Sequence, residues 1–414
     1  MKRLASFIVL VLTFQTAFAQ YNPQNFGKGI NVVGKDSSFT MKFGIRFQTL
    51  MTGNWDVRND DFGYVEDFSS NFLIRRSRFK FSGFAFTPKL KYKMEFGLTN
   101  RDIGGGIDSE HNNAPRFILD AFVDWNFYGN FSLKAGQSKL PGNRERVISS
   151  ANLQLVDRSR LNSRFNIDRD IGIQLKHHFT IGDNFIVKEV AALTQGEGRN
   201  LTVDNIGGYD YTFRLEMLPF GKFQSKGDYV GGAIKREEKP KLALGFTYDI
   251  NDRAQRERGQ GGSFIYNEDG SYATGKTLNT VFLDLMFKYK GLSVMAEYAN
   301  KWTEDGEVGV HDNVEYILIV GNYYAGTGLN LMAGWMFNNN IELTGRYTMI
   351  TPDTDGPYND ETEYTIGLSK YFVGHKLKVQ TDLSYRQKGF ADDVSINAGL
   401  DDILFWRLQM DIHF

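Results

Sequence analysis

The chain has 414 residues, of which 41% are hydrophobic and 23% charged, with 43 glycines and no cysteine. The 34 Phe, 20 Tyr and 5 Trp give more apolar surface than a disordered chain carries. The absence of cysteine excludes disulfides and thiolate metal sites. The 48 basic and 49 acidic residues leave a net charge of −1. No overall field therefore attracts nucleic acid, and we expect no nucleic-acid partner.

Residues 1–19 are predicted to be a signal peptide. Lys2 and Arg3 precede a short apolar run over residues 4–14, and residues 17–19 (Ala-Phe-Ala) form a cleavage site. The run is shorter than the roughly 20 apolar residues that a membrane-spanning helix needs. We therefore expect an exported mature chain, residues 20–414, that forms a single domain.

The rest of the chain alternates between apolar and polar residues with a period of two. From Phe39 to Phe47 every second residue is apolar, and the same holds from Leu90 to Leu98. This period predicts strands with one apolar and one polar face. The segments are 39–51, 72–86, 89–99, 116–127, 131–138, 169–179, 185–195, 209–218, 241–250, 278–289, 292–301, 327–337, 341–350, 361–372, 376–387 and 402–414.

Short and long connections alternate between these segments. Tight turns such as Thr87-Pro88 and Lys290-Gly291 alternate with long polar segments such as 53–70 and 251–277. This is the pattern of an outer-membrane barrel, since in hydrocarbon only a closed barrel pairs every backbone group of its strands. We predict an all-β fold, a transmembrane antiparallel up-and-down β-barrel of about 16 strands with short periplasmic turns and long extracellular loops. A barrel of this size encloses a water-filled channel.

Two segments add detail to this prediction. Segment 219–240 is too long for a periplasmic turn, and we expect it to fold back as a small element at the rim. The last segment, 402–414, alternates up to a carboxy-terminal Phe. This ending resembles the signal by which outer-membrane barrels are recognised for insertion.

Four stretches resemble motifs of one family. Residues 74–79 read IRRSRF, residues 119–124 read LDAFVD, residues 136–172 read GQSKLPGNRERVISSANLQLVDRSRLNSRFNIDRDIG, and residues 343–347 read LTGRY. In this order they are similar to the phosphate-selective porins O and P of Gram-negative bacteria. The resemblance implies a trimeric, sixteen-stranded porin whose constriction is lined by arginines that pass phosphate. The Asp-Arg-Ser at residues 157–159 is a mild departure from the family's Glu-Arg-Ser.

Positive charge is concentrated in two parts of the chain. Residues 72–95 hold seven basic residues and one acid, and the third loop, 139–170, holds seven basic residues and four acids. On the second strand Phe79 faces lipid, so alternation turns Arg76, Arg78 and Lys80 into the lumen. Arg75 is expected at the outer rim, within reach of lipopolysaccharide phosphate.

Arginine suits anion contact because its planar fork binds phosphate oxygens and keeps its charge at neutral pH. In sixteen-stranded porins the third loop tends to fold into the pore, so 139–168 is the candidate pore-constricting loop. The candidate anion-contacting residues are Arg76, Arg78, Lys80, Lys91, Lys93, Arg144, Arg146, Arg158, Arg160 and Arg164.

Other features favour a less selective pore. The acids of the third loop can pair with its arginines, which would then brace the loop, and the outer segments 53–70 and 351–363 are acidic and would repel anions. Asp353 and Asp355 superficially resemble a calcium loop, but the glycine falls at the wrong position for an EF-hand. A solvated acidic loop is the default interpretation, and we expect no cofactor and no metal elsewhere.

No motif predicts an enzyme, because the chain has no G-x-S-x-G, Walker or dinucleotide-binding sequence and its histidines are scattered. We predict an outer-membrane porin for passive diffusion of small hydrophilic solutes, favouring anions such as phosphate. Its partners would be these anions, outer-membrane lipid, lipopolysaccharide and further copies in a homotrimer. A non-selective general porin is the nearest alternative. An outer-membrane barrel with a structural, adhesive or hydrolase role is the alternative from another class.

Overall fold

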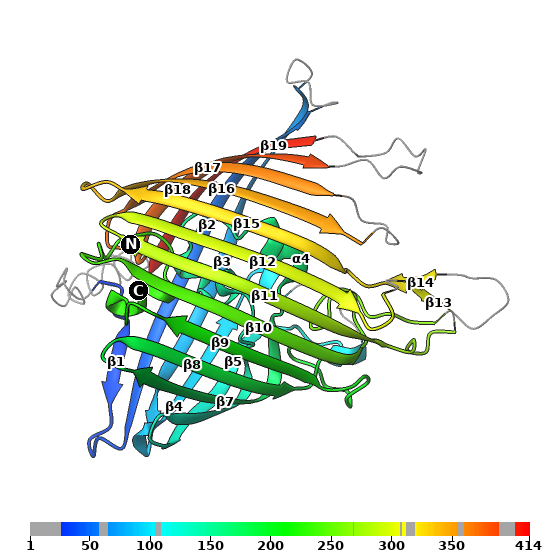
Figure 1. Ribbon diagram of the computed structural model, residues 1–414, viewed down its shortest axis with the longest axis horizontal. Helices are drawn as coiled ribbons and strands as arrows, with labels where there is room; N and C mark the ends of the chain where they lie inside the picture. Colours follow the sequence, from blue (N-terminus) through cyan, green and yellow to red (C-terminus); the bar gives the residue numbers. More distant parts are fainter. Residues whose placement is uncertain are drawn as a thin grey trace, which may run out of the picture.

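The computed structural model is a closed antiparallel β-barrel of sixteen strands (Figure 1). It describes residues 26–57, 65–103, 109–267, 269–306, 309–311, 319–353, 360–388 and 402–414, so the predicted signal peptide lies outside the described residues. The barrel strands are β2 (Phe39–Val57), β3 (Val65–Ala85), β4 (Thr87–Gly97), β5 (Ile118–Tyr128), β6 (Phe131–Lys139), β7 (Arg169–Ile181), β8 (Phe185–Thr194), β9 (Asp210–Leu218), β10 (Lys241–Ala254), β11 (Lys276–Tyr289), β12 (Leu292–Thr303), β15 (Gly326–Met336), β16 (Ile341–Pro352), β17 (Glu361–Tyr371), β18 (Leu377–Lys388) and β19 (Asp402–His413).

Each barrel strand pairs antiparallel with its neighbours in the sequence, and the wall closes where β19 pairs with β2. This closing register runs from His413↔Arg46 to Asp402↔Val57. Closure matters because an open edge would leave unpaired amides in lipid. The prediction of the barrel and of all sixteen strands is confirmed, although β2 and β3 extend further toward the long loops than the alternation indicated.

Three further strands were not predicted. The short strand β1 (Ile30–Val33) pairs with the beginning of β2, over Thr40–Phe43, beyond the end of β19. The other two, β13 (Gly309–His311) and β14 (Ile319–Asn322), form a small separate hairpin outside the barrel sheet. Both features lie in segments without a long alternating pattern.

The two faces of the wall differ as the alternation predicts. On β17 the side chains of Ile366 and Leu368 are 57% and 47% exposed on the outer face, whereas Thr365 and Ser369 are buried on the inner face. An apolar exterior and a polar interior are the arrangement of a transmembrane barrel. Among the described residues no helix is both long and apolar enough to cross a membrane.

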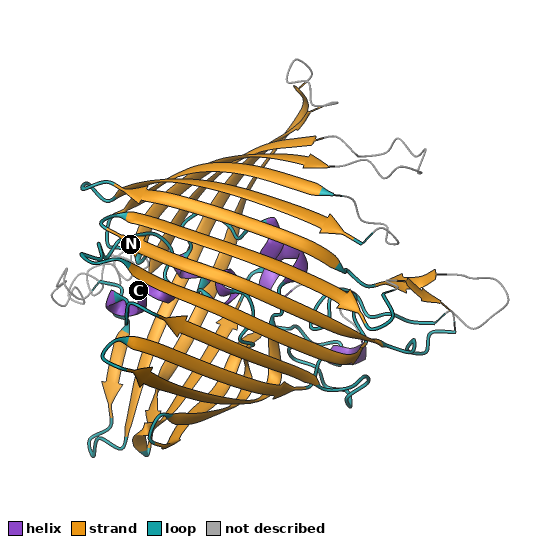
Figure 2. Cartoon of the chain, viewed as in Figure 1, coloured by secondary structure: helices purple, strands orange, loops and turns teal. Residues whose placement is uncertain are grey.

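Segment 139–168 leaves the wall after β6 and crosses the interior. It contains three short helices, α3 (Arg144–Val147), η3 (Ser150–Asn152) and α4 (Arg160–Phe165), and Figure 2 shows how small such helices are beside the strands. The segment reaches well-separated parts of the wall, because Ser150 Oγ accepts a hydrogen bond from Arg46 of β2 and Arg144 Nε donates to Asp284 of β11. The remaining short helices are α2 (Asn100–Ile103) and η2 (Ser109–His111) in the loop after β4, and η4 (Gln224–Tyr229).

Segment 219–240, which contains η4, differs from its prediction as a rim element. It enters the interior between β9 and β10 and meets segment 139–168 there, since the Gly231 amide donates to the Asn152 carbonyl at 2.7 Å. An apolar cluster of Ile148, Leu153, Leu155, Phe223 and Tyr229 lies between these two segments and the wall. One side of the lumen is therefore packed like a protein core.

Candidate functional site

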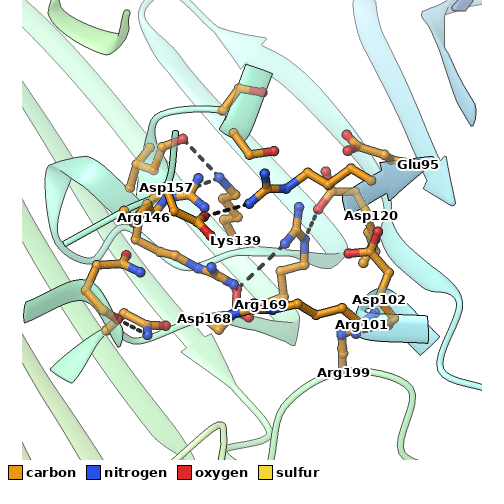
Figure 3. Close-up of a pocket in the computed structure, with 18 of the residues that line it drawn as sticks. Glu95, Arg101, Asp102, Asp120, Lys139, Arg146, Asp157, Asp168, Arg169 and Arg199 are labelled. Atoms are coloured by element: carbon orange, nitrogen blue, oxygen red, sulfur yellow. Dashed lines mark hydrogen bonds and ion pairs between the residues drawn. The ribbon is translucent and has the colours of Figure 1, made fainter. Parts of the chain in front are cut away.

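The other side of the lumen holds an open cavity of about 640 Å³. It lies between strands β3 to β7 and the inner face of segment 139–168, and Figure 3 shows the side chains that converge on it. Fourteen basic and six acidic side chains line it, an excess of eight positive charges. The near-zero charge of the whole chain therefore conceals a strongly basic interior.

A β-bulge brings Arg75 and Arg76 to this cavity together. The register between β2 and β3 passes from Gln48↔Arg76 directly to Thr49↔Ile74, which leaves Arg75 as the extra residue. At such a bulge two consecutive side chains can point to the same face. Arg75 is 7% exposed and lines the lumen, so its predicted place at the outer rim near lipopolysaccharide is wrong.

Both of these arginines bind the same loop carboxylate. Arg75 Nη2 lies 2.7 Å from Asp157 Oδ2, and Arg76 Nη2 lies 3.1 Å from Asp157 Oδ1. Burial alone would raise the pKa of Asp157, but the charges of Arg75 and Arg76 outweigh it and hold this pKa well below its ordinary value of 3.8. The Asp157 carboxylate thus fixes segment 139–168 to β3.

The basic side chains of the wall are also paired with acids. Arg78 Nη2 is 2.9 Å from Asp102 Oδ1, and its Nη1 is 3.2 Å from Glu95 Oε1. Lys93 Nζ is 2.7 Å from Glu95 Oε2 and also contacts Asp120. No acid lies between Arg76 and Lys80 in the sequence, and the acidic partners of these wall residues come from β4, β5 and the loop after β4.

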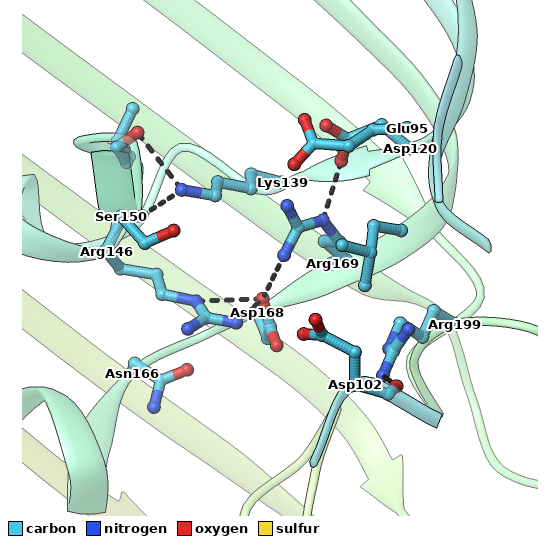
Figure 4. A network of polar contacts seen from close by, with 12 residues as sticks. Glu95, Asp102, Asp120, Lys139, Arg146, Ser150, Asn166, Asp168, Arg169 and Arg199 are labelled. Carbon is cyan, nitrogen blue, oxygen red and sulfur yellow. Dashed lines mark hydrogen bonds and ion pairs between the residues drawn. The ribbon is translucent and has the colours of Figure 1, made fainter. Parts of the chain in front are cut away.

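A chain of alternating charges continues onto segment 139–168 (Figure 4). Arg169 Nε donates to Asp120 Oδ1 at 2.6 Å, and Arg169 also faces Asp168, which accepts from Arg146 Nε at 2.8 Å. Burial would raise the pKa of Asp168, but the neighbouring Arg146 and Arg169 lower it far below the ordinary value. This network keeps Asp168 ionised and the loop docked.

Four other basic residues at the cavity have backbone carbonyls, not carboxylates, as hydrogen-bond partners. Lys139 donates to the Arg146 carbonyl at 2.6 Å, and Arg158 donates to the Glu145 and Ile148 carbonyls at 2.8 and 2.7 Å. Arg199 donates to the Arg116 carbonyl at 2.7 Å. Arg258 donates to the Ser163 carbonyl at 2.9 Å. We call Lys139, Arg158, Arg199 and Arg258 the carbonyl-bound bases. A carbonyl orients a cation without cancelling its charge.

Two of the carbonyl-bound bases, Arg158 and Arg199, remain charged at neutral pH. Burial, reinforced by the charge of Arg146, lowers the pKa of Arg158 to about 9, and burial lowers the pKa of Arg199 to about 10. Both values stay above 7, so these two guanidinium groups keep their positive charge under physiological conditions.

Six of the ten predicted anion-contacting residues line the cavity: Arg76, Arg78, Lys93, Arg146, Arg158 and Arg160. The other four do not. Lys80 and Lys91 lie on β3 and β4, nearer the end of the barrel with the short turns, and Arg164 pairs with Glu361 beside the ring of Tyr324.

Arg144 lies on the opposite side of segment 139–168 from the cavity. It is fully buried, with Nε 2.7 Å from Asp284 Oδ1 and Nη2 3.0 Å from Glu216 Oε2. Its guanidinium therefore anchors the loop to β9 and β11. This agrees with the interpretation that arginines of the third loop pair with acids and brace the loop.

Sequence reasoning missed eight basic residues of the lining: Arg75, Arg101, Lys134, Lys139, Arg169, Arg199, Arg258 and Arg407. Arg407 could have been found, because alternation along the last strand places it on the polar face. Arg199 and Arg258 belong to the later loops 195–209 and 255–275, for which no sequence pattern indicates a contact with the third loop.

Among the described residues no group of three His, Cys, Asp or Glu side chains is arranged to hold a metal ion. Of the two acids that superficially resemble a calcium loop, Asp353 is described and Asp355 lies outside the described residues. The prediction of a solvated acidic loop there stays a prediction.

Known proteins resemble this chain in fold and sequence. An uncharacterised protein of Aquifex aeolicus is 24% identical over 339 residues, which is 75% of this chain and 74% of that protein. The structure resembles an anion-selective porin from Comamonas acidovorans (TM-score 0.51, 11% identity, 91% of this chain and 100% of the other). It also resembles OmpF of Salmonella typhi (TM-score 0.55, 12% identity, 93% and 100%).

The family model described as phosphate-selective porin O and P matches residues 47–217, which include the bulge of β3, segment 139–168 and most of the basic lining. This family and these folds are those of outer-membrane channels rather than enzymes, which agrees with the prediction of a non-enzymatic channel. Over residues 47–217 the chain thus matches the phosphate-selective porin O and P family, which confirms the resemblance predicted from its sequence.

Proposed function

We propose that this outer-membrane porin passes small hydrophilic solutes by passive diffusion and favours anions such as phosphate. The excess of eight positive charges at the cavity carries the proposal. Uncompensated positive charge in a water-filled lumen with low-dielectric walls raises the local concentration of anions and lowers that of cations. Arg158, Arg199 and Arg258 supply part of this charge, because within the described residues they bind backbone carbonyls and form no ion pair with a carboxylate.

The proposal also requires that anions leave the site again. A conducting pore must bind its ion weakly enough for release. Here the paired acids meet this requirement, because Glu95, Asp102, Asp120, Asp157 and Asp168 lie among the basic side chains and moderate their field. Segment 139–168 acts as the constriction in this proposal, since it crosses the lumen and forms one wall of the cavity.

The nearest alternative is a general porin with the family fold but without strong selectivity. The ion pairs favour it, since most arginines of the cavity neighbour an acid. The acids of segments 53–70 and 351–363 favour it as well: Glu361 and Glu363 pair with arginines inside the barrel, and the others would repel anions if they lie at the entrance. The two functions differ in the sign and size of the reversal potential.

The remaining parts of the proposal concern the cell. We propose that residues 1–19 direct export, that the apolar outer face contacts outer-membrane lipid and lipopolysaccharide, and that the barrel assembles as a homotrimer, as the family resemblance implies. An exposed apolar belt that includes Trp335, Leu343 and Ile366 provides the surface for lipid and for neighbouring copies.

Reversal potentials in planar bilayers under a potassium chloride gradient test the proposal. We expect a potential of the sign that favours chloride, and we expect added phosphate to reduce the chloride current by competing for the cavity. A potential that favours potassium would contradict anion preference. A potential near zero, with no effect of phosphate, would support the general porin.

A further inference from the structure

Segment 219–240 comes from the end of the barrel with the short turns and contacts segment 139–168, which comes from the opposite end. The Gly231 amide donates to the Asn152 carbonyl at 2.7 Å, and the Gly232 amide donates to Gln154 Oε1 at 3.2 Å. The contact leaves no space for a side chain, because a Cβ on Gly231 would lie 2.6 Å from the Asn152 carbonyl oxygen. The two segments are thus fitted to each other inside the lumen.

Segment 219–240 is held to the wall by polar contacts from several strands. Asp228 Oδ2 lies 2.7 Å from Lys188 Nζ of β8, and Tyr229 Oη donates to Glu216 Oε2 of β9 at 2.5 Å. Lys288 of β11 donates to the Val230 carbonyl at 2.6 Å. Arg236 donates to the carbonyl of Met336, the last residue of β15, at 2.7 Å. These partners cover one side of the barrel.

The space between the two segments and the wall is filled by apolar side chains. Met286, Met295 and Met332 of β11, β12 and β15 pack in one cluster with Leu153 of segment 139–168 and Phe223 of segment 219–240. Each of these five residues is buried. Methionine fills irregular gaps well, so this side of the lumen has little room for water.

We propose that segment 219–240 is an internal plug that closes the β8–β18 side of the lumen. It also holds segment 139–168 in position from the end of the barrel with the short turns. Solutes then pass only along the basic cavity beside β3 to β7. The charged residues that face the plugged side, such as Asp284 and Lys288, act as positioning residues and do not meet permeating ions. This proposal holds whether or not the pore prefers anions.

The absence of cysteine from the chain gives a direct test by thiol labelling. Ser293 of β12 is 1% exposed and faces the plugged side, where its hydroxyl accepts from Gln154 Nε2 at 2.9 Å, whereas Ser149 is exposed and lines the cavity. In intact channels, we expect a charged water-soluble maleimide to modify Ser149→Cys at least roughly tenfold faster than Ser293→Cys, because the buried thiol reacts only after local opening. Equal rates would overturn the proposal.

A second test displaces the plug and measures conductance. Gly231→Leu should separate segment 219–240 from segment 139–168, raise the single-channel conductance roughly twofold as water enters the second half of the lumen, and expose Ser293→Cys. The matched control is Gly261→Leu, since a Cβ on Gly261 meets nothing within 4 Å. A folded Gly231→Leu channel with unchanged conductance and protected Ser293→Cys would refute the plug. Reversal potentials of the same channels report ion preference separately, so failure of anion selectivity would not be mistaken for failure of the plug.

Discussion

Arg146 and Arg158 lie on the same segment and line the same cavity, yet they contribute differently to its field. Arg146 binds the carboxylate of Asp168, whereas Arg158 binds only the carbonyls of Glu145 and Ile148. An ion pair has little net charge at a distance, while a carbonyl-bound guanidinium keeps a full one. The selectivity of the pore should therefore depend on which bases have acids beside them.

Two single substitutions should shift ion preference in opposite directions. Asp168→Asn removes an acid and leaves Arg146 without a carboxylate partner, while Arg169 keeps Asp120, so we expect the anion-to-cation permeability ratio to rise. Arg158→Gln removes an uncompensated base, so the ratio should fall. A unit charge several ångströms from the path changes the ratio roughly threefold in water-filled surroundings. Reversal potentials measure the permeability ratio of each variant. Shifts of the same sign in the two variants would contradict the charge argument.

The ion pairs that join Asp157 of segment 139–168 to β3 should not change with pH in the ordinary range. Because the pKa of Asp157 is held well below 3.8 in the folded protein, its ion pairs stabilise the fold above the pKa of the unfolded chain and are lost only as the pH falls through the lower folded value. We expect no conductance step that depends on Asp157 from pH 8 down to about pH 4. A conductance step with a midpoint inside this range, absent in Asp157→Asn, would show that this carboxylate titrates there.

At the scale of elements, alternation predicts much more of the wall than of its contents. All sixteen strands follow from the period of two, because each must present one face to lipid and one to water. The bulge at Arg75 was missed, because one extra residue in a long strand leaves no mark in an otherwise regular pattern. It reversed the predicted direction of Arg75 and hence its role.

The interior was the least predictable part, since its contacts join residues far apart in the sequence. Arg160 pairs with Glu361 and Arg46 with Asp411, and neither partner can be read from local spacing. Counting bases and acids within loop 139–170 identified a basic loop, but it could not show that Arg144 points away from the cavity. The length of segment 219–240 indicated an unusual turn, but it could not show that this turn folds into the lumen.

Arg144 offers a test of how segment 139–168 is held in place. Arg144→Met leaves Asp284 and Glu216 buried near each other with one guanidinium fewer, and removing one partner of such a buried group costs about 3–5 kcal/mol. We expect the loop to undock, with larger and noisier single-channel currents and faster cleavage of the loop by external protease. Arg253→Met is the control, because the Arg253 side chain is 60% exposed in its pair with Asp252. Equal behaviour of the two variants would show that Arg144 is not an anchor.

For the whole molecule, charge is separated in space while the total stays near zero. The cavity beside β3 to β7 has an excess of positive charge, whereas the sequence segments 53–70 and 351–363 hold mostly acids, of which Glu361 and Glu363 are buried in ion pairs with arginines. If the other acids of these segments lie at the entrance, as the sequence predicts, an anion crosses an unfavourable region before it reaches a favourable interior. The balance between the two regions sets the net preference, and both act through fields that salt can screen.

Ionic strength should accordingly control the selectivity of the whole channel. The Debye length falls from about 10 Å at 0.1 M salt to about 3 Å at 1 M, which is shorter than the width of an aqueous lumen. We expect the anion-to-cation permeability ratio to be highest in dilute potassium chloride and to approach unity in concentrated salt. The opposite shifts of Asp168→Asn and Arg158→Gln should shrink in parallel, because screening removes the field through which both act. A ratio that stays constant from dilute to concentrated salt would instead indicate selection by direct contact with the carbonyl-bound bases, and phosphate competition measured at 1 M salt would then identify which of them makes that contact.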